Sequence, residues 1–451
     1  MKTPICDFVR SYNEQNAIRL HMPGHKGVGL LGCESLDITE IPGADSLYDA
    51  KGIIKESEMY ASRLFGCKTF YSTEGSSHCI RAMLYLVALY AKQEGMSPVI
   101  LAARNVHKTF LSAVSLCGID VEWIYPDNQS SYLSCYISPE QLDNAIKKMD
   151  DKPVAVYVTS PDYLGNLLDI RELSKVCRKH GVLLVVDNAH GAYLRFLPKS
   201  LHPVNVGAHI CCDSAHKTLP VLTGGAYLHL SSRAPEIFYF KAKDALSLFG
   251  STSPSYLVLQ SLDAANKYLS EDYYNQLELF CAKVNELKER LTANGFTVLD
   301  NEPLKITLSV KSYGYTGYEF AEVLSNNGIV CEFFDPDNVV LMLTPEIGLF
   351  RLSVIEEILL SIPKLKPIVR TPPKINFAKK AVSVKEALFS ESEVVYASES
   401  KGRILATTCV SCPPAVPILM PGEIIQETHI RAFKYYGIEQ IAVIKDKHRA
   451  E

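Results

Sequence analysis

The sequence predicts an α/β protein with a mainly parallel sheet, because short apolar segments alternate with helix-length segments between about 69 and 225. The apolar segments are rich in Val, Ile, Leu and Ala, a composition typical of strands buried on both faces. Capping and turn residues punctuate the alternation. The predicted strands are 99–102, 121–124, 154–159, 182–187, 208–212 and 226–230.

Helix boundaries are indicated by capping residues and glycines. The segment 53–65 predicts a helix that ends at Gly66. Asp169-Ile-Arg-Glu172 is a capping box that opens a helix ending at Gly181. A long helix is expected over about 272–294.

The C-terminal third has a different pattern. Residues 296–365 are expected to form strand, helix, strand, strand and helix, with a capping box from Thr316 to Glu319. Prolines between 363 and 373 mark a linker. The tail holds a third capping box, Ser383 to Glu386, a Pro-rich turn region over 412–417, and a final helix and strand ending near Ile444.

These patterns divide the chain into several domains, as its 451 residues require. We expect an N-terminal arm over 1–50 and a large domain over 51–270. A small α+β domain should follow over 271–366, and a C-terminal domain over 374–451.

Composition excludes several classes of protein. With 47% hydrophobic and 21% charged residues, the chain is typical of a globular enzyme. A net charge of −4 and a pI near 6.3 predict no nucleic-acid or membrane partner. The apolar stretch 83–91 is too short to span a bilayer, and no signal sequence follows Met1, so we expect a cytoplasmic protein.

Cysteine usage supports a reducing compartment and predicts no metal site. The 13 cysteines cannot all pair within the chain. The pair Cys409 and Cys412 is the only C-x-x-C, and it lacks a second ligand pair at zinc-site spacing.

An Asp and a Lys are the residues that most clearly indicate the chemistry of the site. Asp187 closes one predicted strand, and Lys217 follows the next strand along the chain. Because open α/β sheets bind ligands at the carboxyl ends of their strands, the two side chains should meet there. This pair suits pyridoxal phosphate (PLP), with Lys217 as Schiff-base lysine and Asp187 at the pyridine nitrogen. Taken singly, each residue has an ordinary structural explanation.

Hydroxyl-bearing residues are candidates for the phosphate of the cofactor. Gly75, Ser76 and Ser77 stand where a strand leads into a helix, and a helix N-terminus suits an anion. The alternative is a Ser N-cap after a Gly turn. Ser214 and His216 flank Lys217 and can add phosphate contacts. The run Ser251-Thr252-Ser253 can do the same or form the turn before the next helix.

Two histidines are candidates for proton transfer. His107 follows a predicted strand, where an imidazole can stack on a flat cofactor and shuttle protons; the alternative is a polar loop residue. His190 lies three residues after Asp187 and can tune its carboxylate or the phenolic oxygen of the cofactor. A structural His held by the backbone is the alternative there.

Taken together, the motifs resemble the Orn/Lys/Arg decarboxylase family, which has the aspartate-aminotransferase-like fold type I. The resemblance covers nearly the whole chain. The motifs come in the order His-Met-Pro-Gly-His-Lys (21–26), Glu-Gly-Ser-Ser (74–77), Arg-Asn-x-His-Lys (104–108), Asp-Asn-Ala-His-Gly-Ala (187–192), Ser-Ala-His-Lys-Thr-Leu (214–219), Ser-Thr-Ser-Pro-Ser-Tyr (251–256) and Pro-Gly-Glu (421–423).

The resemblance implies a PLP-dependent decarboxylase of lysine, arginine or ornithine that acts in polyamine biosynthesis. It implies Lys217 as the Schiff-base residue, Asp187 at the pyridine nitrogen and His107 stacked on the ring. The remaining implied cofactor contacts are Gly75, Ser76, Ser77, Ala189, His190, Ser214 and His216, with Thr252 reaching in from the second subunit of a homodimer.

The chain departs from the family at three places. Asn188 stands where Glu is common, Glu74 stands where Asn is usual, and Ala415 replaces a usual Gly. Glu74 and Asp45 are candidates for the pocket of the substrate's distal amine. The chain also begins near its His-Met-Pro-Gly-His-Lys motif and so resembles the short subgroup without an N-terminal wing domain.

Other functions remain open on the residues alone. An aminotransferase or a β-eliminating lyase uses the same scaffold, and Arg351 is the nearest candidate for a carboxylate clamp, although we prefer a surface role for it. A catalytically silent, partner-binding relative is a further alternative, which the presence of Lys217 and Asp187 disfavours.

Overall fold

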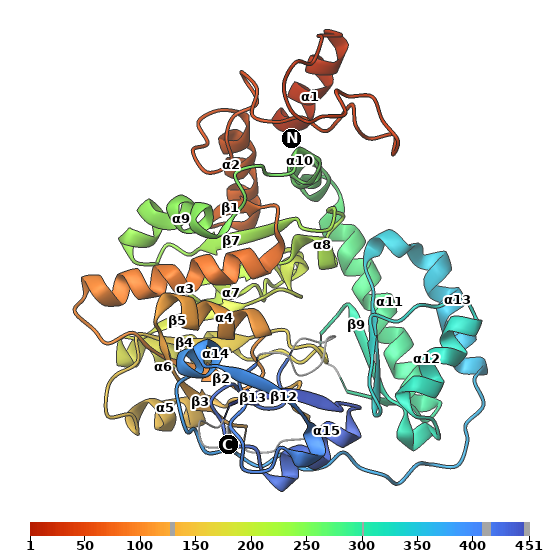
Figure 1. The fold of residues 1–451 in the computed structure, drawn as a ribbon. Helices are drawn as coiled ribbons and strands as arrows, with labels where there is room; N and C mark the ends of the chain where they lie inside the picture. Colours follow the sequence, from red (N-terminus) through yellow and green to blue (C-terminus); the bar gives the residue numbers. More distant parts are fainter. Residues whose placement is uncertain (127–130, 300–301, 408–415, 446–451) are drawn as a thin grey trace. The chain divides into compact units, whose positions relative to one another are not determined.

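The computed structural model describes residues 1–126, 131–299, 302–407 and 416–445. Contacts group them into two units (Figure 1): residues 1–96 with 170–278, and residues 97–169 with 279–451. The C-x-x-C pair Cys409 and Cys412, and the departure at Ala415, lie outside the described residues.

The strands of the first unit run in the order β1 (Lys68–Ser72), β7 (Ala226–Leu230), β6 (Ile210–Asp213) and β5 (Leu183–Asp187). β5 and β6 are parallel, whereas β6 with β7 and β7 with β1 are antiparallel. Every residue of β5, β6 and β7 is buried. Apolar strands with two covered faces explain this burial.

Helices cover the sheet of the first unit. α3 packs along α9 and against β6 and β7 (Figure 1). α1 and α10 both contact α2. The helices are α1 (Pro4–Glu14), α2 (Ile53–Phe65), α3 (Gly75–Gln93), α6 (Ile170–His180), α7 (Pro203–Val206), α8 (Ala215–Thr218), α9 (Glu236–Phe249) and α10 (Tyr256–Ser270).

The second unit contains parallel strands in the order β4 (Ala155–Thr159), β2 (Val99–Ala103) and β3 (Asp120–Ile124). An antiparallel sheet has the order β10 (Phe333–Phe334), β11 (Asn338–Met342), β9 (Lys305–Ser309) and β8 (Thr297–Val298). β12 (Ser392–Tyr396) pairs with β13 (Gln440–Ile444). The helices are α4 (Lys108–Cys117), α5 (Pro139–Lys147), α12 (Gly317–Asn326), α13 (Gly348–Ser361), α14 (Val384–Phe389) and α15 (Glu427–Tyr435). The helix α11 (Tyr273–Ala293) includes residues of both units.

Several sequence predictions are confirmed at the level of single residues. α2 ends before Gly66, which takes the left-handed conformation (φ 68°) that glycine tolerates. The capping box at Thr316 and Glu319 is formed. Ser383 accepts a hydrogen bond from Glu386 N and so caps α14. The region 296–365 contains one more strand than predicted, because two short segments, β8 and β9, pair with each other.

The helix α1 was missed, since its segment is predicted to be an irregular arm. Its first N–H groups are satisfied from far along the chain: Asp263 Oδ2 accepts from Ile5 N at 2.9 Å and from Cys6 N at 3.0 Å. An anionic acceptor at a helix N-terminus is favourable. No local pattern shows this contact, because Asp263 lies on α10.

Candidate active site

Asp187 and Lys217 are delivered by neighbouring strands of the first unit. Asp187 is the last residue of β5 and is only 2% exposed, and Lys217 lies on α8, directly after β6. Because β5 and β6 are parallel, both segments emerge at the same carboxyl edge. Asp187 Oδ1 accepts from Ala189 N at 3.2 Å, which fixes the orientation of the carboxylate.

His190 contacts Lys217 through one nitrogen of its imidazole ring. Its Nε2 lies 2.9 Å from Lys217 Nζ, and the imidazole is 5% exposed. A neutral imidazole that accepts from an ammonium can later take its proton. The arrangement therefore gives Lys217 a buried proton acceptor within hydrogen-bonding distance.

The candidate phosphate residues also come together. Gly75 is the first residue of α3, with Ser76 and Ser77 in its first turn, and Ser214 Oγ donates to Ser76 Oγ at 2.7 Å. The N-cap is Glu74, which makes no side-chain capping bond, so the alternative of a Ser cap is wrong. Space is open where a side chain of Gly75 would lie. A helix N-terminus with two hydroxyls beside open space suits a phosphate.

Glu74 forms a hydrogen bond with the segment Ser251-Thr252-Ser253, which precedes α10. Its Oε1 accepts from Ser251 N at 2.6 Å, and Ser251, Thr252 and Ser253 are all exposed. His216 Nδ1 lies 2.9 Å from Gly225 O, which orients the second ring beside Lys217. Glu74 therefore connects the start of α3, the candidate phosphate site, to the segment that contains Thr252, and its carboxylate has a structural partner.

His107 belongs to the second unit and is the N-cap of α4. Its Nδ1 accepts from Thr109 N at 3.2 Å and lies 2.9 Å from Thr109 Oγ1. Thr109 thereby fixes the imidazole. Stacking of His107 on a cofactor stays a prediction.

Two motifs of the second unit are joined by a buried ion pair. Arg104 Nη2 donates to Glu423 Oε2 at 2.6 Å, and the same oxygen accepts from Met420 N at 2.8 Å. The guanidinium also lies over the rings of Trp123 and Tyr125. The pair fixes the loop after β2, which carries His107, to the C-terminal segment.

Asp45 has a structural role. Its carboxylate accepts from the backbone N–H groups of Lys51, Gly52 and Ile54 and thereby caps α2. Although burial acts to raise it, these backbone donors keep the pKa of Asp45 below its usual value. Its oxygens are thus occupied by the main chain, which disfavours the predicted contact with a distal amine.

A buried polar network under the site was missed by sequence reasoning. Asp213, the residue before Ser214, is fully buried. Its Oδ2 lies 2.9 Å from His202 Nε2 and 3.1 Å from His229 Nε2, and its Oδ1 accepts from Asn188 Nδ2 at 2.7 Å. The departure at Asn188 is therefore matched by a carboxylate on the adjacent strand. The only signal in the sequence was a charged residue directly after the predicted apolar strand 208–212.

Asp213 is held ionised by its neighbours. Burial acts to raise the pKa of Asp213, but the charges and hydrogen bonds of His202 and His229 hold it well below its usual range. Burial lowers the pKa of His229. The network clamps the ends of β5 and β6, the two strands that carry Asp187 and Lys217.

We predict that Asp213→Asn lowers the free energy of unfolding by at least about 2 kcal/mol, because a buried imidazole N–H would lose its acceptor. The folded-state pKa is depressed, so this contribution is present above the unfolded pKa of about 4 and is lost as the pH falls below it. The difference in the free energy of unfolding between the variant and the wild type should therefore become smaller in acid.

Urea denaturation measures this free energy. The control is Asp244→Asn, a change at an exposed ion pair, which should alter the free energy of unfolding by no more than about 0.5 kcal/mol. Equal stability of Asp213→Asn and the control at pH 7 would contradict the assignment.

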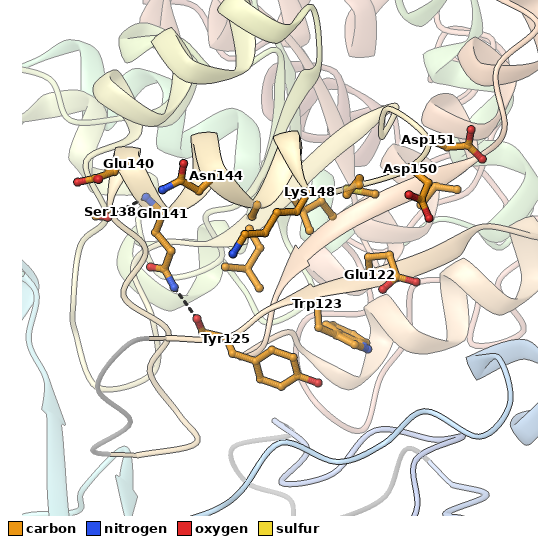
Figure 2. A pocket seen from close by; sticks show the side chains of 15 residues that line it. Glu122, Trp123, Tyr125, Ser138, Glu140, Gln141, Asn144, Lys148, Asp150 and Asp151 are labelled. Atoms are coloured by element: carbon orange, nitrogen blue, oxygen red, sulfur yellow. Dashed lines mark hydrogen bonds between the residues drawn. The ribbon is translucent and has the colours of Figure 1, made fainter.

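A hollow of about 990 Å³ lies in the second unit, beside β3 and α5. Figure 2 shows Lys148 directed into it and the amide of Gln141 donating to the carbonyl of Tyr125. No predicted site residue lines this hollow. It is therefore not a candidate for the reaction centre.

Solved structures with a similar fold include two bacterial lysine decarboxylases. The Francisella novicida lysine decarboxylase matches with a TM-score of 0.81 at 17% identity, covering 98% of this chain and 81% of the other. The Pseudomonas aeruginosa lysine decarboxylase A matches with a TM-score of 0.80 at 17% identity, covering 98% and 80%. The chain therefore has the fold of the fold type I enzymes, as predicted.

The sequence matches two family models, the Orn/Lys/Arg decarboxylase major domain over residues 3–301 and its C-terminal domain over residues 366–442. The chain belongs to this family of amino-acid decarboxylases and is a carboxy-lyase. It is 30% identical to a Bacillus subtilis relative called uncharacterized protein YaaO, over 96% of this chain and 93% of the relative. It is 29% identical to the arginine decarboxylase of Halalkalibacterium halodurans, over 95% and 92%. Among the described residues, no helix is long and apolar enough to cross a bilayer.

Proposed function

We propose that this chain binds PLP and decarboxylates a basic L-amino acid, with arginine as the first candidate. The observation that carries the proposal is the delivery of Asp187 and Lys217 to one sheet edge by two parallel strands. The full-length relatives named arginine decarboxylase support the choice of arginine. Lysine and ornithine remain the alternatives.

The residues at the edge fit the cofactor. Lys217 would hold it covalently through Nζ, and the buried Asp187 carboxylate would keep a proton on its ring nitrogen. Ser76, Ser77, Ser214 and His216, with the N–H groups at Gly75, would bind its phosphate, beside Ala189. When bound, PLP supplies a ring that accepts the electron pair released by the departing carboxylate.

The remaining side chains position and move protons. His190, 2.9 Å from Lys217 Nζ, would receive a proton from that amine when substrate displaces it. His107, fixed by Thr109, would cover the ring face and serve as a proton carrier for the substrate Cα. The clamp between Asn188 and Asp213 would hold the two strand ends at a constant separation.

The substrate can be identified in an experiment that offers all twenty amino acids at once. We expect the PLP-loaded protein, given a pool of the twenty amino acids, to convert one basic amino acid to its amine, detected by mass spectrometry. Agmatine from arginine is the expected product. Cadaverine or putrescine would move the substrate to lysine or ornithine, and formation of keto acids would favour an aminotransferase. Absence of any amine would contradict the proposal.

We further propose a homodimer in which Thr252 reaches the partner's site. The N-terminal arm exposes six large apolar side chains, each between 62% and 101% exposed, which is typical of a surface that a second copy covers. They are Ile18, Leu20, Met22, Val28, Leu30 and Leu31.

Arg351, the candidate carboxylate clamp of the aminotransferase alternative, is exposed on α13, in agreement with a surface role.

Mixed dimers test the shared site. Lys217→Ala and Thr252→Asp proteins should each be inactive, and dissociation followed by reassociation should restore up to about a quarter of wild-type activity, because half of the dimers are mixed and each has one intact site. Amine formation measures the recovery. If verified mixed dimers stay inactive, Thr252 acts within its own subunit or not at all.

We also propose that the enzyme acts in the cytoplasm, in the formation of polyamine precursors. The eleven cysteines among the described residues are all unpaired, as in proteins of reducing compartments. Decarboxylation of a basic amino acid yields a diamine or guanidino-amine, which is the chemical class from which polyamines are built.

A further inference from the structure

A second hollow lies at the opposite edge of the sheet in the first unit. Its volume is about 460 Å³, and it is bordered by the start of β5 at Leu183, by His209 just before β6, and by the ends of α3 and α6. Asp187 is at the other end of β5. The hollow is thus separate from the candidate active site.

Two arginines give this hollow a positive wall. Arg178, at the end of α6, and Arg233, after β7, both line it. Arg178 Nη1 donates to Ser174 Oγ at 3.0 Å, and among the residues described neither guanidinium forms an ion pair. Burial lowers the pKa of His209 to about 4, and both arginines add to the effect. The three groups are therefore close enough to sense one another's charge.

His209 lines the hollow with a largely buried imidazole. It is 9% exposed, and its Nδ1 accepts from Leu184 N at 2.9 Å. Because Nδ1 is an acceptor, the proton of the neutral ring is on Nε2. Within the described ranges Nε2 has no protein partner. This N–H is therefore available to donate a hydrogen bond to a ligand oxygen in the hollow.

We propose that this hollow binds a phosphate group, free or carried by a small molecule, through Arg178, Arg233 and His209. Paired guanidinium groups match phosphate geometry, and the first-turn N–H groups of α9 border the same space. A hollow of this size falls in the range of small-molecule sites, about 300–1,000 Å³. Two carboxylates, Glu94 and Glu236, also line it and weaken anion binding.

Binding is measured by equilibrium dialysis on the PLP-loaded protein, so that the phosphate site of the cofactor is already filled. The probes are inorganic phosphate, AMP and adenosine. We expect phosphate and AMP to bind and adenosine not to bind. Tighter binding of AMP identifies a phosphorylated small molecule as the source, and equal binding identifies the free anion. No binding of either anion, or equal binding of adenosine, overturns the proposal.

Variants of exposed residues test the contacts without threatening the fold. Arg178→Gln with Arg233→Gln should weaken phosphate binding at least about tenfold, because two charge-assisted hydrogen-bond donors are lost. Glu94→Gln should strengthen it. Arg171→Gln, an exposed change on the same helix that does not line the hollow, is the matched control. Unchanged binding in the double variant, with an unchanged melting temperature, would refute the site.

Discussion

Lys217→Ala should lower the rate of amine formation by more than about four powers of ten while leaving the fold intact. The lysine is half-buried on a short helix after β6, and it is the nucleophile to which the cofactor would be attached. Loss of such a group removes the covalent attachment of the cofactor. Mass-spectrometric detection of the amine measures the rate.

The matched control is Lys241→Ala, since that lysine lies in an exposed ion pair on α9 of the same unit. It should keep near wild-type activity. Both variants should unfold at the wild-type urea concentration. A Lys217→Ala protein that retains more than about a hundredth of the wild-type rate would exclude Lys217 as the attachment residue.

Asp187→Asn should lower kcat by about 10²- to 10³-fold with little change in stability. The buried carboxylate would hold a proton on the ring nitrogen, and at about 4 Å and an effective dielectric of about 20 this attraction is worth about 4 kcal/mol. An amide of the same shape cannot supply it. The loss should appear in kcat more than in KM, because the interaction strengthens as charge flows into the ring.

Retention of PLP by the variant distinguishes an electrostatic role of Asp187 at the ring nitrogen from a purely structural role in the fold. The Asp187→Asn protein should still bind PLP, measured by absorbance after gel filtration. Near-normal kcat in a variant that retains PLP would show that the ring nitrogen lies elsewhere.

The fold could be predicted because its sequence signals are local. Apolar strands, Gly66 and the capping box at Thr316 each act within a few residues, and the structure has them where predicted. The position of Asp187 and Lys217 at one edge of the sheet follows from a general property of parallel strands, which requires no knowledge of long-range contacts.

What was missed depends on contacts between distant residues. Asp263 caps α1 from more than two hundred positions away, and Asp213 gathers His202 and His229 from separate elements. A charged residue at the end of an apolar strand gives no indication of its partners. The roles of Asn188 and Glu74 became interpretable only once Asp213 and Ser251 were seen beside them.

The central claim is that Lys217 holds PLP, and the most direct test is reduction of the PLP-loaded wild-type protein with borohydride, followed by proteolysis and peptide mass spectrometry. We predict a single phosphopyridoxyl group on the peptide that contains Lys217, and none in the Lys217→Ala protein. A label on another lysine of the wild-type protein, or a label that persists in Lys217→Ala, would contradict the account.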